Sequence, residues 1–137
     1  MNKVLRRFVL VALIATTTAA VSAPMHKSRS RLATTRQLME GMLHANYLAI
    51  ENAATAVRTD VQSWNALAIN PALLNEASYL IVEDDRSLGT SWDDAAEQLR
   101  AGSADMLAKI AAREKTGIES SLKVIAKACT DCHAAHR

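Results

Sequence analysis

The chain has 137 residues, with 16 Lys and Arg against 14 Asp and Glu, a formal net charge of +2 and 4% aromatic residues. No cluster of basic residues alternates with aromatic ones, so the composition argues against a nucleic-acid-binding protein. The length fits one domain.

The first 23 residues predict a secretory signal peptide. Three basic residues precede an apolar run over residues 8–14, and small residues then lead to Ala23 before Pro24. This order matches an export signal, and the run is shorter than the roughly 20 apolar residues of a membrane span. Cleavage after Ala23 removes three of the 16 basic residues and none of the 14 acidic ones, leaving 13 against 14. We therefore expect a periplasmic protein without a membrane span or a nucleic-acid partner.

The rest of the chain predicts an all-α domain over residues 34–137, preceded by a polar leader over residues 24–33. Four Ser or Thr residues are each followed, three positions later, by a side chain that can complete a capping box at a helix start. These pairs are Thr34 with Gln37, Thr59 with Gln62, Ser91 with Asp94, and Thr116 with Glu119. The short connections between the predicted helices favour an antiparallel up-down-up-down four-helix bundle.

Apolar residues recur at helical spacing behind each predicted start, which indicates a shared core. The third predicted helix carries the set Trp92, Ala95, Ala96, Leu99, Met106 and Ile110. The second contains Asn70-Pro71, and proline inside a helix removes a backbone hydrogen bond. We expect a kink or a restart there, with Asn70 as the cap and Pro71 at the first helical position.

The most informative motif is Cys129-Thr130-Asp131-Cys132-His133, which matches the C-x-x-C-H sequence that attaches haem c. Helical residues three and four apart share a face, so Cys129, Cys132 and His133 would point the same way. Both thiols can then add to the vinyl groups along one porphyrin edge, while the imidazole binds the iron. The motif predicts one covalent haem c.

Other sites built on these cysteines have weaker support. A structural zinc site needs four Cys or His ligands, and the chain has two Cys without a second paired cluster of His. A redox dithiol of the thioredoxin kind would follow a strand, and the sequence predicts only helices here. A disulfide between Cys129 and Cys132 would close a loop too small to stabilise the fold much.

The second axial ligand of the iron is predicted on the first helix. Met39 is the first choice and Met42 the second, because residues three apart lie on the same helical face, whereas His44 is expected to point away. A thioether ligand would raise the reduction potential and suit electron transfer. The alternative is that both methionines are core residues that pack near the ring.

Two arginines are predicted near the cofactor. Arg36 lies one turn before Met39, where its guanidinium could pair with a haem propionate, or it could remain a solvated first-turn residue. Arg137 follows His133 by one turn and could meet a propionate or shield the imidazole, or fray as the last residue. His136 is expected to face the haem side too, where simple packing or exposure is favoured over a role in binding the cofactor.

A C-x-x-C-H motif at the end of a four-helix chain, followed by Arg four residues after the His, resembles the class II c-type cytochromes. These include cytochrome c-prime and its low-spin relatives. In that family a Met or Leu shortly after an Arg-Gln pair sits over the open face of the iron, and Arg36-Gln37-Leu38-Met39 is similar. The spacing is one residue shorter than in many cytochromes c-prime, and His136 stands where an aromatic residue is usual.

The resemblance implies two functions. The first is a one-electron carrier that exchanges electrons with redox partner proteins, with His133 and Met39 as axial ligands. The alternative is a five-coordinate, high-spin haem protein that binds NO or CO. A homodimer is compatible with either. An enzyme such as a peroxidase has little support, because no His-Arg pair stands out as a distal acid and charge stabiliser.

Overall fold

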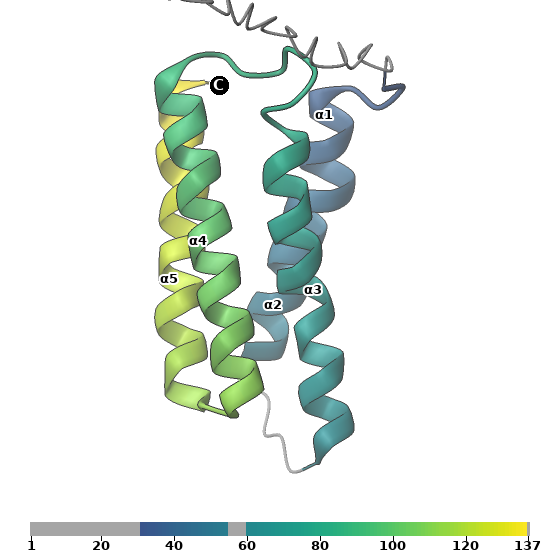
Figure 1. The fold of residues 1–137 in the computed structure, drawn as a ribbon, viewed down its shortest axis with the longest axis vertical. Coiled ribbons are helices and arrows are strands. Elements are labelled where there is room, and N and C mark those ends of the chain that lie inside the picture. Colours follow the sequence, from purple (N-terminus) through teal and green to yellow (C-terminus); the bar gives the residue numbers. More distant parts are fainter. Residues whose placement is uncertain (1–30, 55–59, 137) are drawn as a thin grey trace, which may run out of the picture.

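The computed structural model describes residues 31–54 and 60–136, and all regular secondary structure in these ranges is helical. Four long helical rods run alternately in opposite directions (Figure 1). The first rod is formed by α1 (Thr35–Leu38), the π-helix η1 (Met39–His44) and α2 (Ala45–Ala54), and the others are α3 (Val61–Leu80), α4 (Thr90–Ala112) and α5 (Lys115–Ala135). The prediction of an all-helical, four-helix fold is confirmed for these residues.

Several predicted features fall outside the described residues. These are the signal peptide over residues 1–23, leader residues 24–30, Thr59 and Arg137. Within the described ranges, none of the helices is both long enough and apolar enough to span a membrane.

The first helix begins at the predicted capping box. The backbone N–H of Gln37 donates to the Thr34 hydroxyl at 3.2 Å. The backbone N–H of Thr34 donates in return to the Gln37 side-chain oxygen at 2.9 Å. Both interactions of the box are present, so the start predicted from Thr34 and Gln37 is confirmed.

The predicted start of the second helix is shifted by one residue. Asp60, not Thr59, is the N-cap of α3, and its carboxylate accepts a hydrogen bond from the backbone N–H of Ser63 at 2.8 Å. The helix then continues through Pro71 to Leu80 without a restart, so the restart predicted at Asn70 is wrong. Pro71 is fully buried, and burial of this face of α3 favours the helix despite the N–H that proline lacks.

The two remaining predicted starts are also wrong, because the preceding turns set the helix ends. Helix α4 follows Gly89, which has φ +113°, a conformation that favours glycine. Ser91 therefore lies inside the helix, and its hydroxyl is bonded elsewhere. Arg113 ends α4 in the left-handed conformation with φ 58°, and α5 begins two residues later at Lys115. Thr116 is then already helical and caps nothing.

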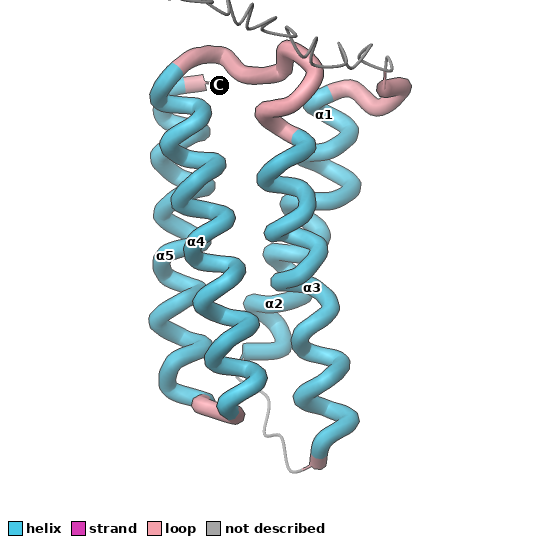
Figure 2. The backbone as a smooth tube through the Cα atoms, viewed as in Figure 1, coloured by secondary structure: helices cyan, strands magenta, loops and turns pink. Residues whose placement is uncertain are grey.

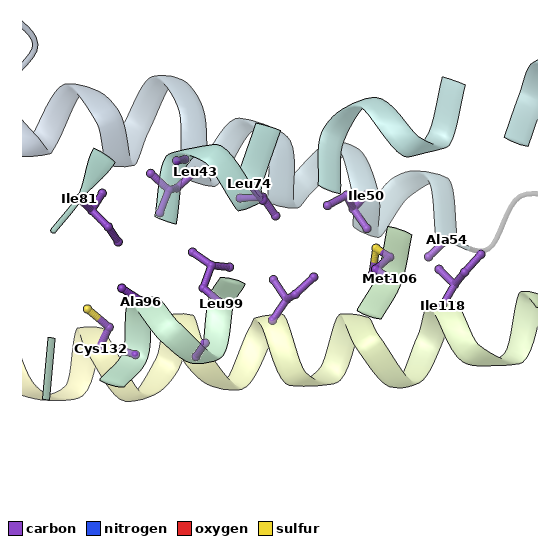
Figure 3. Packing of buried hydrophobic residues seen from close by; sticks show 14 of the residues in the cluster. Leu43, Ile50, Ala54, Leu74, Ile81, Ala96, Leu99, Met106, Ile118 and Cys132 are labelled. Carbon is purple, nitrogen blue, oxygen red and sulfur yellow. The ribbon is translucent and has the colours of Figure 1, made fainter. Parts of the chain in front are cut away.

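The core runs between the helices along most of the bundle (Figure 3). All six apolar residues predicted for the third helix are buried, and they pack with fully buried residues of the other helices: Ile50, Leu74, Ile118 and Ile125. Gly102 lets α4 and α5 approach closely, since a Cβ there would lie 3.0 Å from the Ile125 side chain.

The helices meet their neighbours to different extents. Helices α4 and α5 pack along their length, and α3 packs against both α4 and the first helix. The first helix and α5 meet much less, through α2. Figure 2 shows that the loops lie at the ends of the bundle, so the middle of the bundle is formed by helices alone.

The loop between α3 and α4 is fixed at the end of the bundle where α5 finishes. The indole N–H of the buried Trp92 donates to the backbone carbonyl of Ile81 at 2.7 Å. Arg86 donates to the carbonyls of Leu80 and Ala33 at 3.0 and 2.8 Å. These bonds hold the start of α4 close to the end of α3.

Candidate functional site

A cavity of about 420 Å³ lies between α5 and the first helix. Its α5 wall consists of Ala126, Ala128, Cys129, Thr130, Cys132 and His133, and its opposite wall consists of Met39, Glu40, Leu43, His44 and Tyr47. Four residues of the α3 end and α4 form its base: Ile81, Ala95, Ala96 and Leu99. The lining is mostly apolar, with polar groups at the edges.

Alanines create this cavity. Ala95, Ala96 and Ala128 are buried and line it, whereas larger residues fill the core nearer the other end of the bundle, for example Met106 and Ile118. A core position occupied by a methyl group leaves unfilled volume that a Leu or Ile would occupy. The cavity is therefore encoded by small residues on two adjacent helices.

The three residues of the predicted attachment motif all line the cavity. Cys129, Cys132 and His133 lie within the uninterrupted helix α5, and all three line the cavity. Cys132 is 7% exposed, and Cys129 is partly buried. In Figure 3, the Cys132 side chain extends from α5 toward the space bordered by Leu43 and Ile81. All three residues of the motif therefore border the same cavity.

Both cysteines are free thiols, and their surroundings favour the neutral form. Burial raises the pKa of the Cys129 thiol, and the neighbouring Cys132 raises it further. Burial likewise raises the pKa of Cys132. A raised pKa lowers the thiolate fraction at neutral pH, and the thiolate is the nucleophile of redox dithiols. This environment differs from that of a reactive dithiol.

The opposite wall is shaped by the π-helix η1, which the sequence analysis did not anticipate. In a π-helix the hydrogen bonds join residues five apart instead of four, so residues five apart come to share a face. Met39 and His44 are five apart, and both line the cavity. The expectation that His44 points away is wrong for this reason.

Met42 lies outside the cavity lining. It is partly buried and packs against the core cluster. The expectation of a shared face for Met39 and Met42 assumed an ordinary α-helix, in which residues three apart lie together. The wider turn of η1 separates them, and of the two sulfurs it leaves Met39 at the cavity.

Arg36 is not brought to the cavity. Its guanidinium pairs with Glu40 at 2.8 Å, and the side chains are 86% and 67% exposed. The hydrogen bond from Arg36 to Glu40 raises the pKa of the arginine. In this structure Arg36 has the solvated, first-turn position that was the alternative to propionate pairing.

Tyr47 of α2 also lines the cavity. Its hydroxyl donates to Glu51 at 3.3 Å. Burial raises the pKa of Tyr47, with further contributions from the charges of Glu51 and of Cys129 across the cavity. The sequence signal for Tyr47 at the cavity was its position on the first helix, about one turn after His44.

No group of three or more His, Cys, Asp or Glu side chains among residues 31–54 and 60–136 is placed to hold a metal ion. Comparison of the chain with known protein families, with curated proteins and with solved structures gives no match.

Proposed function

We propose that the chain is a periplasmic c-type cytochrome of the class II kind that carries one covalent haem c and transfers single electrons between redox partner proteins. The observation that carries this proposal is the meeting of Cys129, Cys132 and His133 on one wall of an apolar cavity. Met39 lies on the opposite wall. The motif and the cavity are independent signals, because Ala95 and Ala96, two of the buried alanines that open the cavity, lie far from the motif in sequence.

The cavity suits an apolar group. Its volume of about 420 Å³ falls within the range of about 300–1,000 Å³ typical of cofactor pockets. The buried alanines on α4 and α5 provide an apolar base and wall, and the exposed lining residues Glu40, His44 and Thr130 leave an edge where charged substituents can reach solvent. The donor set also suits iron porphyrin, with an imidazole on one side and a thioether on the other.

The residues have distinct roles in this proposal. Cys129 and Cys132 would hold the group covalently, each thiol S–H adding across one vinyl group so that a C–S bond forms and the proton goes to the adjacent vinyl carbon. His133 would provide an imidazole nitrogen, and Met39 a thioether sulfur, as ligands to the iron.

The iron supplies one-electron chemistry by alternating between its ferric and ferrous states. Leu43, Leu99 and Ile81 exclude water from the buried part of the cavity, which favours the less charged state. The covalent attachment at Cys129 and Cys132 fixes the group to α5, so that electron exchange requires little rearrangement of the helices.

Mass spectrometry of the protein produced in a haem-attaching host tests this proposal. The denatured chain should retain one haem mass on the peptide that contains Cys129 and Cys132. The double variant Cys129→Ser/Cys132→Ser should lose it. An unmodified wild-type peptide with two free thiols would refute the proposal.

The absorption spectrum separates the two functions that the sequence left open. A low-spin, six-coordinate haem supports electron transfer. A high-spin, five-coordinate haem that takes up NO or CO supports the gas-binding alternative instead.

A further inference from the structure

Two imidazoles lie on opposite walls of the cavity. The described residues contain three histidines, and two of them, His44 on η1 and His133 on α5, line the cavity. The third, His136, is hydrogen bonded to Ser91 outside the cavity lining. Nitrogen donors on facing walls are the arrangement that can bind one iron from both sides.

His44 is available for such a role. Its side chain is exposed at the cavity edge and forms no hydrogen bond or ion pair with the residues that the structure describes. It is positioned by the π-helix, which places it on the same side as Met39. Short π-helical segments occur frequently at functional sites, and here the consequence of the wider turn is a second iron-binding side chain at the cavity.

We propose that His44 is a haem-iron ligand on the side opposite His133, in competition with Met39. This inference rests on the proposed function, because it concerns the same cavity and the same cofactor. Met39 and His44 are the two ends of one π-helical segment, and both line the cavity, so either can approach a group bound there. Glu40 and Leu43 lie between them on the same wall and bring no comparable ligand.

The two ligands have different electronic effects. A thioether is a soft donor that favours ferrous iron and raises the reduction potential. An imidazole nitrogen is a harder donor that favours ferric iron. Binding by His44 therefore lowers the reduction potential relative to binding by Met39, and the competition sets the potential at which the protein exchanges electrons.

The test uses the full haem-loaded chain in both oxidation states, with absorption and electron paramagnetic resonance spectra as readouts. Met39→Leu preserves the side-chain volume while removing the sulfur, and His44→Ala removes the imidazole at an exposed position. The double variant removes both. Met42→Leu is the matched control for a methionine outside the cavity lining, and Glu40→Gln is the control for an exposed residue on the same wall.

We expect Met39→Leu to remain low-spin and six-coordinate, with the spectrum of two nitrogen ligands and a lower reduction potential. The double variant Met39→Leu/His44→Ala should become high-spin, and added imidazole should return it to low spin. Both controls should keep the wild-type spectrum.

The inference is overturned if Met39→Leu alone is as fully high-spin as the double variant, or if the wild type is high-spin. A wild type without covalent haem would refute the proposed function and this inference with it. The mass of the denatured chain distinguishes that outcome from the loss of a single ligand.

Discussion

The Nε2 atom of His136 lies 2.9 Å from the hydroxyl of Ser91, which joins the end of α5 to the first turn of α4. The His136 ring also meets the ring of Trp92 edge-on, with centroids 5.4 Å apart and planes at 81°. Trp92 is in turn bonded to the carbonyl of Ile81. The last turn of α5, which carries His133, is therefore docked on α4.

Replacing His136 with Ala should loosen that last turn. The variant loses both the hydrogen bond to Ser91 and the edge-on ring contact, each worth about 0.5–1.5 kcal/mol. Hydrogen exchange of the backbone amides near His133 should become faster, with little change in the middle of α5. Ser91→Ala keeps the ring contact and should have the smaller effect. Equal exchange in wild type and His136→Ala would contradict this account.

Filling the cavity should separate the stability of the chain from its ability to hold a cofactor. Ala96 is 1% exposed and lines the cavity. In the haem-free chain, Ala96→Leu should raise the free energy of unfolding by about 1 kcal/mol, because it fills empty volume. The same variant should carry much less covalent haem when it is produced in a haem-attaching host.

Ala101→Leu is the matched control for this experiment, since Ala101 lies on the same helix but is exposed. It should leave haem content unchanged. Normal haem content in Ala96→Leu would show that the cavity is not where the group binds.

The thiols should make the haem-free chain less stable at alkaline pH. Burial raises the pKa of Cys129 and Cys132 above the ordinary value of 9.0. The unfolded chain therefore releases these protons first, so the free energy of unfolding falls as the pH rises above that value. Urea titrations at neutral and alkaline pH should show that the free energy of unfolding falls more steeply with pH for wild type than for Cys129→Ala/Cys132→Ala. The same pH dependence in the two proteins would contradict a contribution from the thiols.

Truncating the core between α4 and α5 should be costly. Ile125 is fully buried and faces Gly102, where an added Cβ would lie 3.0 Å from the Ile125 side chain. Ile125→Ala should reduce the free energy of unfolding by about 2–5 kcal/mol, as measured by denaturant titration. The adjacent Val124 is 46% exposed, and Val124→Ala should cost less than about 1 kcal/mol. Similar losses for both would mean that the two helices are packed differently.

The helical fold and the α5 side of the cavity could be predicted from sequence because both depend on α-helical periodicity. Thr34 and Gln37 mark the first helix through a local hydrogen-bond pattern. Cys129, Cys132 and His133 share a face through spacing alone. Such short-range relationships do not require knowledge of the tertiary structure.

The wall formed by η1 could not be predicted in this way. A π-helical turn adds one residue to the hydrogen-bonded ring, which shifts the facing of every later residue relative to earlier ones. Because of this shift, His44 lines the cavity and Met42 does not. No capping or turn residue nearby in the sequence indicates the π-helical turn. Asp60 and Gly89 displaced two predicted helix starts for a related reason, because a stronger carboxylate cap or a turn with positive φ decides where a helix begins.

The unequal packing of the helices has a mechanical consequence. Helix α5 is held along its length by α4, while the first helix meets it only lightly. A rocking motion of the first helix can therefore widen or narrow the space between them without disrupting the α4–α5 pair. If the chain carries the proposed haem, any adjustment to a change of oxidation state should appear as displacement of residues 39–47, while α5 stays in place.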